Sequence, residues 1–222
     1  MEIIQNIIPI NKDNRPRHPM KPEYITIHDT ANPNATAVAH GNYLAKNSIA
    51  EKAPVSWHFT VDDTNIVQHL PLNESGYHAG DGNGPGNRKS IGVEICEFSD
   101  AGKRQKAEEK AAQFTAYLTA YLMDELLIPI TNIVQHNHWT GKNCPRVLRG
   151  RANGWGNFIK AVKANMEKEK TKDAPQWKKD GLKFLRDNGM ILSDDWKPED
   201  NVDMGTLGTI LSNLRITGKG LK

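Results

Sequence analysis

The sequence predicts an α/β domain with a mixed central β-sheet of about five or six strands flanked by helices, followed by a small helical module. Short apolar, β-branched segments alternate with longer stretches of helical periodicity, and a charged run near residue 170 precedes two final amphipathic segments. The 222 residues suffice for one well-buried domain and a small extra module. We therefore expect a first domain over residues 1–166, a linker over 167–174 and a helical module over 175–222.

The first segment with strand character covers residues 24–28. Period-two alternation puts Tyr24, Thr26 and His28 on one face of this strand and two isoleucines on the other face. Apolar residues then recur at helical spacing, which predicts a helix over residues 35–46.

A β-hairpin is predicted next, with strands at residues 57–61 and 66–70 joined by a polar turn. Residues 76–89 carry five glycines and are expected to form an irregular loop. This loop lacks the Gly-Lys-Ser/Thr ending of a phosphate-binding loop and leads into a strand pattern at residues 90–96, which excludes that type of site.

Residues 104–127 have the periodicity of a long amphipathic helix, which Pro129 ends. A short strand over residues 133–136 and a helix over residues 155–166 complete the expected first domain. The apolar stripe of the long helix consists of Phe114, Leu118, Tyr121, Leu122 and Leu126.

Composition excludes several classes of protein. The net charge of +3 suits an anionic polymer but gives no clustered basic surface, so no nucleic acid is expected as a partner. No apolar run reaches the roughly 20 residues that span a bilayer, so no membrane insertion is expected. Two cysteines in a chain without a leader do not indicate a disulfide framework.

The histidines and one cysteine suggest a zinc site, since hydrolytic zinc sites combine three protein ligands with one open position for water. His28 ends one predicted strand, His136 and His138 end another, and Cys144 follows in a short glycine-containing loop. Alternate residues of a strand share a face, so spacing does not choose between His136 and His138.

Four segments share their order and spacing with a known family. They read Ile-His-Asp-Thr at residues 27–30, Trp-His-Phe at 57–59, Ser-Ile-Gly-Val-Glu-Ile at 90–95, and His136 followed by Lys-Asn-Cys-Pro at 142–145. This set resembles the type 2 N-acetylmuramoyl-L-alanine amidases, which include phage endolysins, Bacillus autolysins and animal peptidoglycan recognition proteins. The resemblance covers roughly residues 20–160 and looks closest to amidases of Bacillus phages and prophages.

The resemblance implies a zinc enzyme that hydrolyses the amide bond between the lactyl group of N-acetylmuramic acid and L-alanine in bacterial peptidoglycan. It implies that His28, His136 and Cys144 hold the Zn²⁺ ion, and it thereby chooses His136 over His138. Bacterial peptidoglycan is the partner that follows from this resemblance.

Glu94 and Lys142 are the expected catalytic residues. On an alternating strand Glu94 lies opposite the apolar side chains that face the core. Members of the family use a glutamate at this place as general base and acid, which fits proton transfer from water to a leaving amine. Lys142 matches a lysine that in related phage amidases stabilises the tetrahedral oxyanion, a term worth about 3–4 kcal/mol for a single donor.

Trp57 and His78 are expected at the substrate. Some members of the family carry a catalytic tyrosine where this chain has Trp57, which has no acid–base chemistry, so Glu94 takes a larger part in proton transfer. Trp57 either lines the sugar or peptide groove or is a core aromatic. His78 of the glycine-rich loop is expected to contact the substrate. Cys96 shares the face of Glu94 and is interpreted as a packed thiol.

Two alternatives stay open from the sequence. Some relatives recognise peptidoglycan without cutting it and typically lack the zinc cysteine, so Cys144 and Glu94 favour the enzyme. A second alternative is hydrolysis of a different wall bond, either glycosidic or within the stem peptide.

The last part of the chain predicts two short helices, over residues 177–189 and 204–214. They loosely resemble half of a surface-layer-homology unit, which implies wall anchoring. The alternative is a helical pair that packs on the first domain or mediates self-association. Because the N-terminus has no secretory signal, we expect synthesis in the cytoplasm and action on the wall after holin-type or lysis-dependent release.

Overall fold

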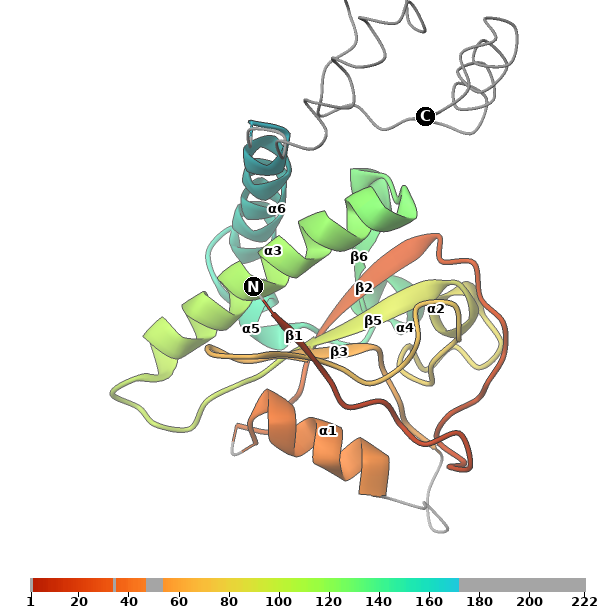
Figure 1. The fold of residues 1–222 in the computed structure, drawn as a ribbon. Coiled ribbons are helices and arrows are strands. Elements are labelled where there is room, and N and C mark those ends of the chain that lie inside the picture. The colour runs from red at the N-terminus through yellow and green to blue at the C-terminus, as the bar shows by residue number, and fades with distance from the viewer. Residues whose placement is uncertain (1, 34, 47–53, 172–222) are drawn as a thin grey trace, which may run out of the picture. The chain divides into compact units, whose positions relative to one another are not determined.

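A computed structural model describes residues 2–33, 35–46 and 54–171 and shows an α/β fold (Figure 1). Six strands form one mixed sheet in the order β1-β4-β3-β5-β2-β6. Helix α3 covers one face of the sheet and helix α1 the other (Figure 1). The predicted fold class, a mixed sheet flanked by helices, is confirmed.

The elements alternate along the chain. The strands are β1 (Ile3–Gln5), β2 (Tyr24–Asp29), β3 (Phe59–Val61), β4 (Ile66–Gln68), β5 (Ser90–Ile95) and β6 (Ile133–Gln135). The helices are α1 (Ala37–Lys46), α2 (Pro85–Arg88), α3 (Arg104–Leu126), α4 (Asn137–Thr140), α5 (Arg146–Gly150) and α6 (Gly154–Thr171), with a 3-10 turn at Ile130–Asn132. Strands β3 and β4 form the predicted antiparallel hairpin, and the other neighbouring pairs are parallel.

The two central strands, β2 and β5, separate the core from the candidate site. Their isoleucines and valine alternate onto one face and pack with α3 and α6 in the main core cluster. The other face of the same strands carries Thr26, His28 and Glu94. The alternation read from the sequence is therefore confirmed, and it directs polar groups toward the face opposite the core.

The glycine-rich segment differs from the expected irregular loop because it contains the short helix α2. The Asp81 carboxylate accepts hydrogen bonds from the backbone N–H groups of Gly86 (2.7 Å) and Asn87 (3.0 Å). It thereby satisfies donors that have no partner inside a helical first turn. A proline at the helix start supports the same conformation.

Two details of the helices differ from the expected pattern. Tyr121 is 44% exposed, because the buried face of α3 runs instead through small residues such as Ala111, Thr115 and Thr119. Helix α6 continues to Thr171, past the expected end at residue 166. Lysine and glutamate favour helix, and they dominate this charged run.

The chain divides into two units, Met1–Met166 and Glu167–Lys222. The helices predicted over residues 177–189 and 204–214 lie outside the described residues. The linker, the wall-anchoring role and self-association therefore stay predictions.

The N-terminal segment is part of the first unit, although the sequence predicted no element there. Strand β1 adds to the sheet edge by pairing parallel with β4. Arg15 then donates two hydrogen bonds to the Glu74 carboxylate (2.7 and 2.6 Å) and one to the Ile8 carbonyl (2.8 Å). A three-residue strand is too short to produce a readable periodicity, which explains why it was missed.

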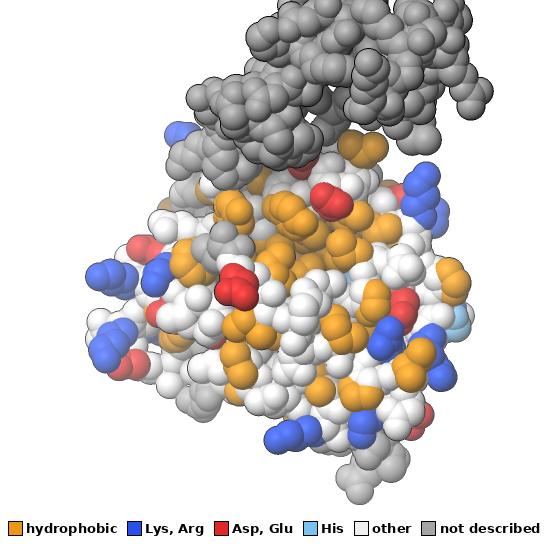
Figure 2. Space-filling model, in the orientation of Figure 1, with side chains coloured by type: hydrophobic (Ala, Val, Ile, Leu, Met, Phe, Trp, Pro, Cys, Tyr) orange, Lys and Arg blue, Asp and Glu red, His pale blue; other side chains and the backbone are white. Residues whose placement is uncertain are grey.

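One face of the molecule is shown in Figure 2. Hydrophobic side chains gather in its middle, while lysine and arginine side chains lie around its rim (Figure 2). Of the helices in the described parts of the chain, none is both long and apolar enough to span a membrane.

Candidate metal centre

The candidate site lies at the carboxyl ends of the central strands. His28 of β2 and Glu94 of β5 are register partners on adjacent parallel strands. His136 directly follows β6, which pairs with the other side of β2, and its N–H donates to the Ile27 carbonyl at 3.1 Å. The carboxyl ends of parallel strands share one edge of the sheet, which brings these residues together and is where α/β proteins bind ligands.

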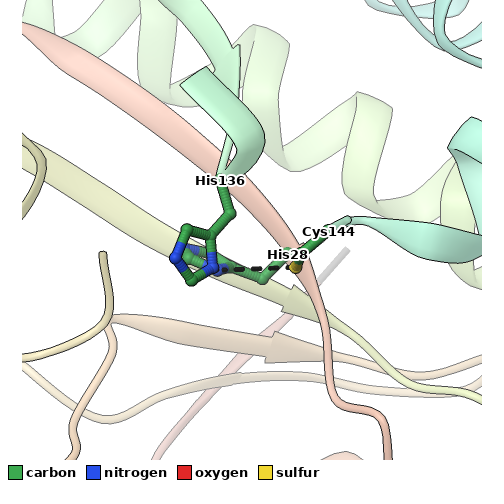
Figure 3. Close-up of side chains that lie close together, drawn as sticks. All are labelled: His28, His136 and Cys144. Atoms are coloured by element: carbon green, nitrogen blue, oxygen red, sulfur yellow. Dashed lines mark hydrogen bonds between the residues drawn. The ribbon is translucent and has the colours of Figure 1, made fainter. Parts of the chain in front are cut away.

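His28, His136 and Cys144 form one buried group, in which the three potential ligand atoms all lie within 4.8 Å of one another (Figure 3). The His28 Nδ1 atom lies 3.0 Å from His136 Nδ1 and 3.9 Å from Cys144 Sγ. In a tetrahedral zinc site with ordinary bond lengths, ligand atoms lie roughly 3.3–3.6 Å apart. The two measured separations lie on either side of this range, and a donor set of two imidazoles and one thiol could hold a metal ion.

The structure also resolves the choice between the two neighbouring histidines. The chain turns from β6 into helix α4 at His136, so His136 and His138 do not share a strand face. His138 is exposed on α4, whereas His136 is buried against His28. His136 therefore belongs to the group and His138 does not.

The loop that carries Cys144 is held by Asn137. The Asn137 side-chain amide donates to the carbonyls of Gly141 (2.8 Å) and Lys142 (3.0 Å), and its backbone N–H donates to the Cys144 carbonyl (3.0 Å). Gly141 adopts a φ of 76°, a conformation that glycine reaches without strain. These bonds fix the thiol beside the two imidazoles.

Burial determines the protonation of the three residues. It lowers the pKa of His28 well below its ordinary value, and the neighbouring His78 and His136 lower it further. Burial also lowers the pKa of His136, so both rings are neutral, as metal binding requires. Burial raises the pKa of the Cys144 thiol to about 12, whereas a coordinated cation favours the thiolate.

Glu94 lies beside the group with one oxygen unused. Its Oε1 atom lies 4.0 Å from His28 Nδ1, and its side chain is 13% exposed. Its Oε2 atom is buried and finds no hydrogen-bond partner among the described residues. Burial raises the pKa of the Glu94 carboxyl well above its ordinary value, and the Asp29 carboxylate raises it further. Buried acceptors without a partner are rare in proteins, so this oxygen is a candidate for contact with a bound molecule.

Lys142 is exposed at the edge of the same site. Its positive charge lowers the pKa of Glu94, opposing the effect of burial, and it also lowers the pKa of Cys144. The structure therefore brings Lys142 close enough to act electrostatically on the group, and its role at the oxyanion stays a prediction.

Asp29 is a supporting residue that the sequence reasoning missed. It is buried, its Oδ2 atom accepts a hydrogen bond from the Val147 N–H at 2.9 Å, and its Oδ1 atom lies 3.8 Å from Cys144 Sγ. Its place in the Ile-His-Asp-Thr segment, directly after His28, was the available signal.

Trp57 lies in a different environment from the group. Its Nε1–H donates to Thr60 Oγ1 at 2.7 Å, and its ring meets His40 and His69 edge to face. It packs against the small apolar cluster of Ile8, Leu44 and Leu70. These are the surroundings of a packing aromatic, and contact with substrate stays a prediction.

His78 contacts the group directly. Its Nδ1 atom lies 3.0 Å from His28 Nε2, and burial lowers its pKa to about 3. Its predicted contact with substrate is untested, but its contact with a candidate metal ligand is now defined. Cys96 is buried with Ala37 and Val67, as expected for a packed thiol.

Comparison with known proteins assigns the chain to a family. The model of the family described as N-acetylmuramoyl-L-alanine amidase (Amidase_2) matches residues 18–147. The chain belongs to this family. The resemblance found in the four sequence segments is confirmed. The residues that match the family model include all three members of the metal group together with Glu94 and Lys142.

The chain is similar to two amidases of Bacillus subtilis (strain 168). The chain is 51% identical to N-acetylmuramoyl-L-alanine amidase XlyA over 160 residues, which cover 71% of the chain and 50% of XlyA. It is 45% identical to N-acetylmuramoyl-L-alanine amidase CwlH over 166 residues, which cover 73% of the chain and 62% of CwlH. The chain therefore spans less than two thirds of the length of either relative.

A solved structure of the catalytic domain of XlyA has the same fold. It is 48% identical, gives a TM-score of 0.65, and the match covers 73% of this chain and 99% of that domain. The part of the chain shared with the amidase family is therefore the part that carries the candidate metal centre.

Proposed function

We propose that the chain is a zinc-dependent N-acetylmuramoyl-L-alanine amidase that hydrolyses the amide bond between the lactyl group of N-acetylmuramic acid and L-alanine in peptidoglycan. The proposal is carried by the buried group of His28, His136 and Cys144, with Glu94 Oε1 4.0 Å from His28 Nδ1. Family membership and the donor set of two imidazoles and one thiol support zinc as the ion.

Each residue has a defined task in this reaction. His28, His136 and Cys144 would hold the zinc ion, which would supply a Lewis acid for the carbonyl and for the attacking water. Glu94 accepts the proton of the attacking water and delivers it to the departing amine of L-alanine. The Lys142 ammonium group neutralises charge that develops on the carbonyl oxygen.

Digestion of purified bacterial walls tests the activity and the bond. We expect turbidity to fall with the native protein, and new N-terminal alanine to appear without new reducing ends. A chelator abolishes both signals, and added zinc restores them. New reducing ends without N-terminal alanine would assign a glycosidic bond, and sedimentation with walls without any cleavage would assign a recognition module.

The two cysteines provide a matched pair for testing the metal. Cys144→Ser should lose both bound zinc and wall lysis, because it removes the thiolate. Cys96→Ala should keep both, because Cys96 lies in a separate apolar cluster. Metal content is measured on both proteins after purification, and full zinc occupancy in the Cys144→Ser protein would refute the ligand set.

A further inference from the structure

Two consecutive residues of the glycine-rich segment contact both imidazoles of the metal group. The His78 ring reaches His28, with 3.0 Å between His78 Nδ1 and His28 Nε2. The backbone of the next residue, Ala79, lies close enough to His136 to raise the pKa of that ring. One short piece of chain thus lies beside two of the candidate ligands.

The contacts of His78 fix which nitrogen of His28 carries the proton. His78 Nε2 lies 3.2 Å from the Ser90 carbonyl oxygen, which can only accept, so Nε2 carries the single proton of the neutral His78 ring. His78 Nδ1 is therefore an acceptor, and His28 Nε2–H donates to it. His28 Nδ1, which faces the group, is left with a free lone pair.

His136 turns the same nitrogen toward the group. Its Nε2 atom lies on the side of Gly80, and its Nδ1 atom lies 3.0 Å from His28 Nδ1. The free lone pair of His28 Nδ1 can therefore accept a proton from His136 Nδ1 or share a cation with it. These two Nδ1 atoms mark the side of each ring on which an ion would bind.

The segment is built to hold its two contacts in place. Asn87 Oδ1 accepts from the backbone N–H groups of both His78 and Ala79, at 2.8 Å each. On the other side of the His78 ring, a Cβ atom on Gly92 would lie 2.7–2.9 Å from three ring atoms. The ring therefore lies flat against β5 only because residue 92 has no side chain.

We propose that His78 is a positioning residue of the metal centre, which sets His28 in the tautomer whose Nδ1 atom binds the ion. This inference rests on the proposed function for the identity of the ion, and it assigns His78 a role other than the predicted contact with substrate. Asn87 and Gly92 support that role through the backbone and the ring.

Metal affinity tests the inference, measured by competition with a chromophoric chelator. His78→Phe keeps a ring but removes both nitrogens, and we expect zinc affinity to fall about 10–100-fold, the usual effect of losing an outer partner of a ligand. His78→Asn should recover much of the affinity, because its Oδ1 atom can accept from His28. If His78 only touched substrate, His78→Phe would raise KM and leave zinc affinity unchanged. That result would overturn the proposal.

Two glycine substitutions distinguish a loss of positioning from a general loss of folding. Gly92→Ala should displace the His78 ring and weaken zinc binding as His78→Phe does, while leaving His78 itself in the chain. Gly150→Ala is the control, since a Cβ there meets nothing within 4 Å. Unchanged zinc affinity in Gly92→Ala, in a protein with native circular dichroism, would contradict the role of the ring.

Nitrogen NMR of the ring nitrogens provides a readout that needs neither zinc nor activity. In ¹⁵N-labelled metal-free protein, long-range proton–nitrogen correlations should show His28 protonated at Nε2, and a mixture of tautomers after His78→Phe. The same pure tautomer in both proteins would overturn the positioning role. If the chain instead binds no zinc and cleaves no wall, the proposed function fails, and the tautomers still report on His78 separately.

Discussion

Glu94 and His28 are register partners on adjacent parallel strands, and Glu94 Oε1 lies 4.0 Å from His28 Nδ1. Strand pairing alone therefore sets the carboxylate beside the candidate metal ligand, without a contribution from any loop. The second carboxylate oxygen, Oε2, is buried and finds no partner among the described residues. In the proposed reaction, Glu94 would move protons while three other residues would hold the ion.

Replacing Glu94 should therefore affect rate and not metal content. We expect Glu94→Gln to lower kcat about 10²–10⁴-fold, the usual contribution of a general acid–base group, with zinc occupancy unchanged. Glu125→Gln, at an exposed position of α3, serves as the control. Wall turbidity and metal content are measured on the same preparations, and loss of zinc from Glu94→Gln would make the residue a ligand instead.

Lys142 should act on the transition state through its charge. We expect Lys142→Met to lower kcat roughly 10²–10³-fold, as for removal of one oxyanion donor, with little change in zinc affinity. Lys103→Met is the matched control because its side chain is 86% exposed. A rise in KM with an unchanged kcat would show that Lys142 binds substrate and does not stabilise the oxyanion.

Zinc should stabilise the fold, because its three ligands come from segments far apart in the chain and converge only in the folded protein. Free zinc at 100 times its Kd contributes about 2.7 kcal/mol. For a domain of this size that is a rise in Tm of roughly 5–10 °C. Thermal denaturation of metal-free and zinc-loaded protein measures the rise. Cys144→Ser should show almost none of it, and an equal rise in that variant would mean that zinc binds elsewhere.

The ion pair between Arg15 and Glu74 should stabilise the first unit above acidic pH. The two side chains are 11% and 19% exposed, and the Arg15 hydrogen bond holds the pKa of Glu74 below its ordinary value. A lowered carboxyl pKa stabilises the fold above the unfolded value of about 4.3, and this contribution is lost as pH falls through the folded pKa.

Removal of that pair is the corresponding experiment. We expect Arg15→Met to lower the free energy of unfolding by about 1–2 kcal/mol at pH 7, since charged hydrogen bonds are lost. Urea unfolding across pH 3–7 should show the two proteins converging as pH falls below about 4. A difference that stays constant over that range would assign the loss to the Ile8 contact, which does not titrate.

The sequence predicted the fold well where regular alternation is long enough to read. Strands β2 and β5 each have six residues, and their alternation correctly put His28 and Glu94 on the face opposite the core. Strand β6 has three residues and passes directly into a helix, so periodicity could not separate His136 from His138. The family resemblance made that choice, and the geometry agrees with it.

The supporting contacts of the site could not be predicted, because they are tertiary. Asn87 holds the backbone at residues 78 and 79 across a segment that local sequence describes only as rich in glycine. Likewise Gly92 leaves room for the His78 ring that packs on it, and the sequence of its own strand does not indicate this contact.

The N-terminal strand has a practical consequence for anyone who shortens the protein. The family match begins at residue 18, whereas the folded unit already begins at β1, Ile3–Gln5. A truncation placed at the start of the family match would delete this strand and Arg15, and it would uncover the backbone of β4. An uncovered strand pairs readily with other chains, so such a fragment should aggregate even though every residue of the metal centre is present.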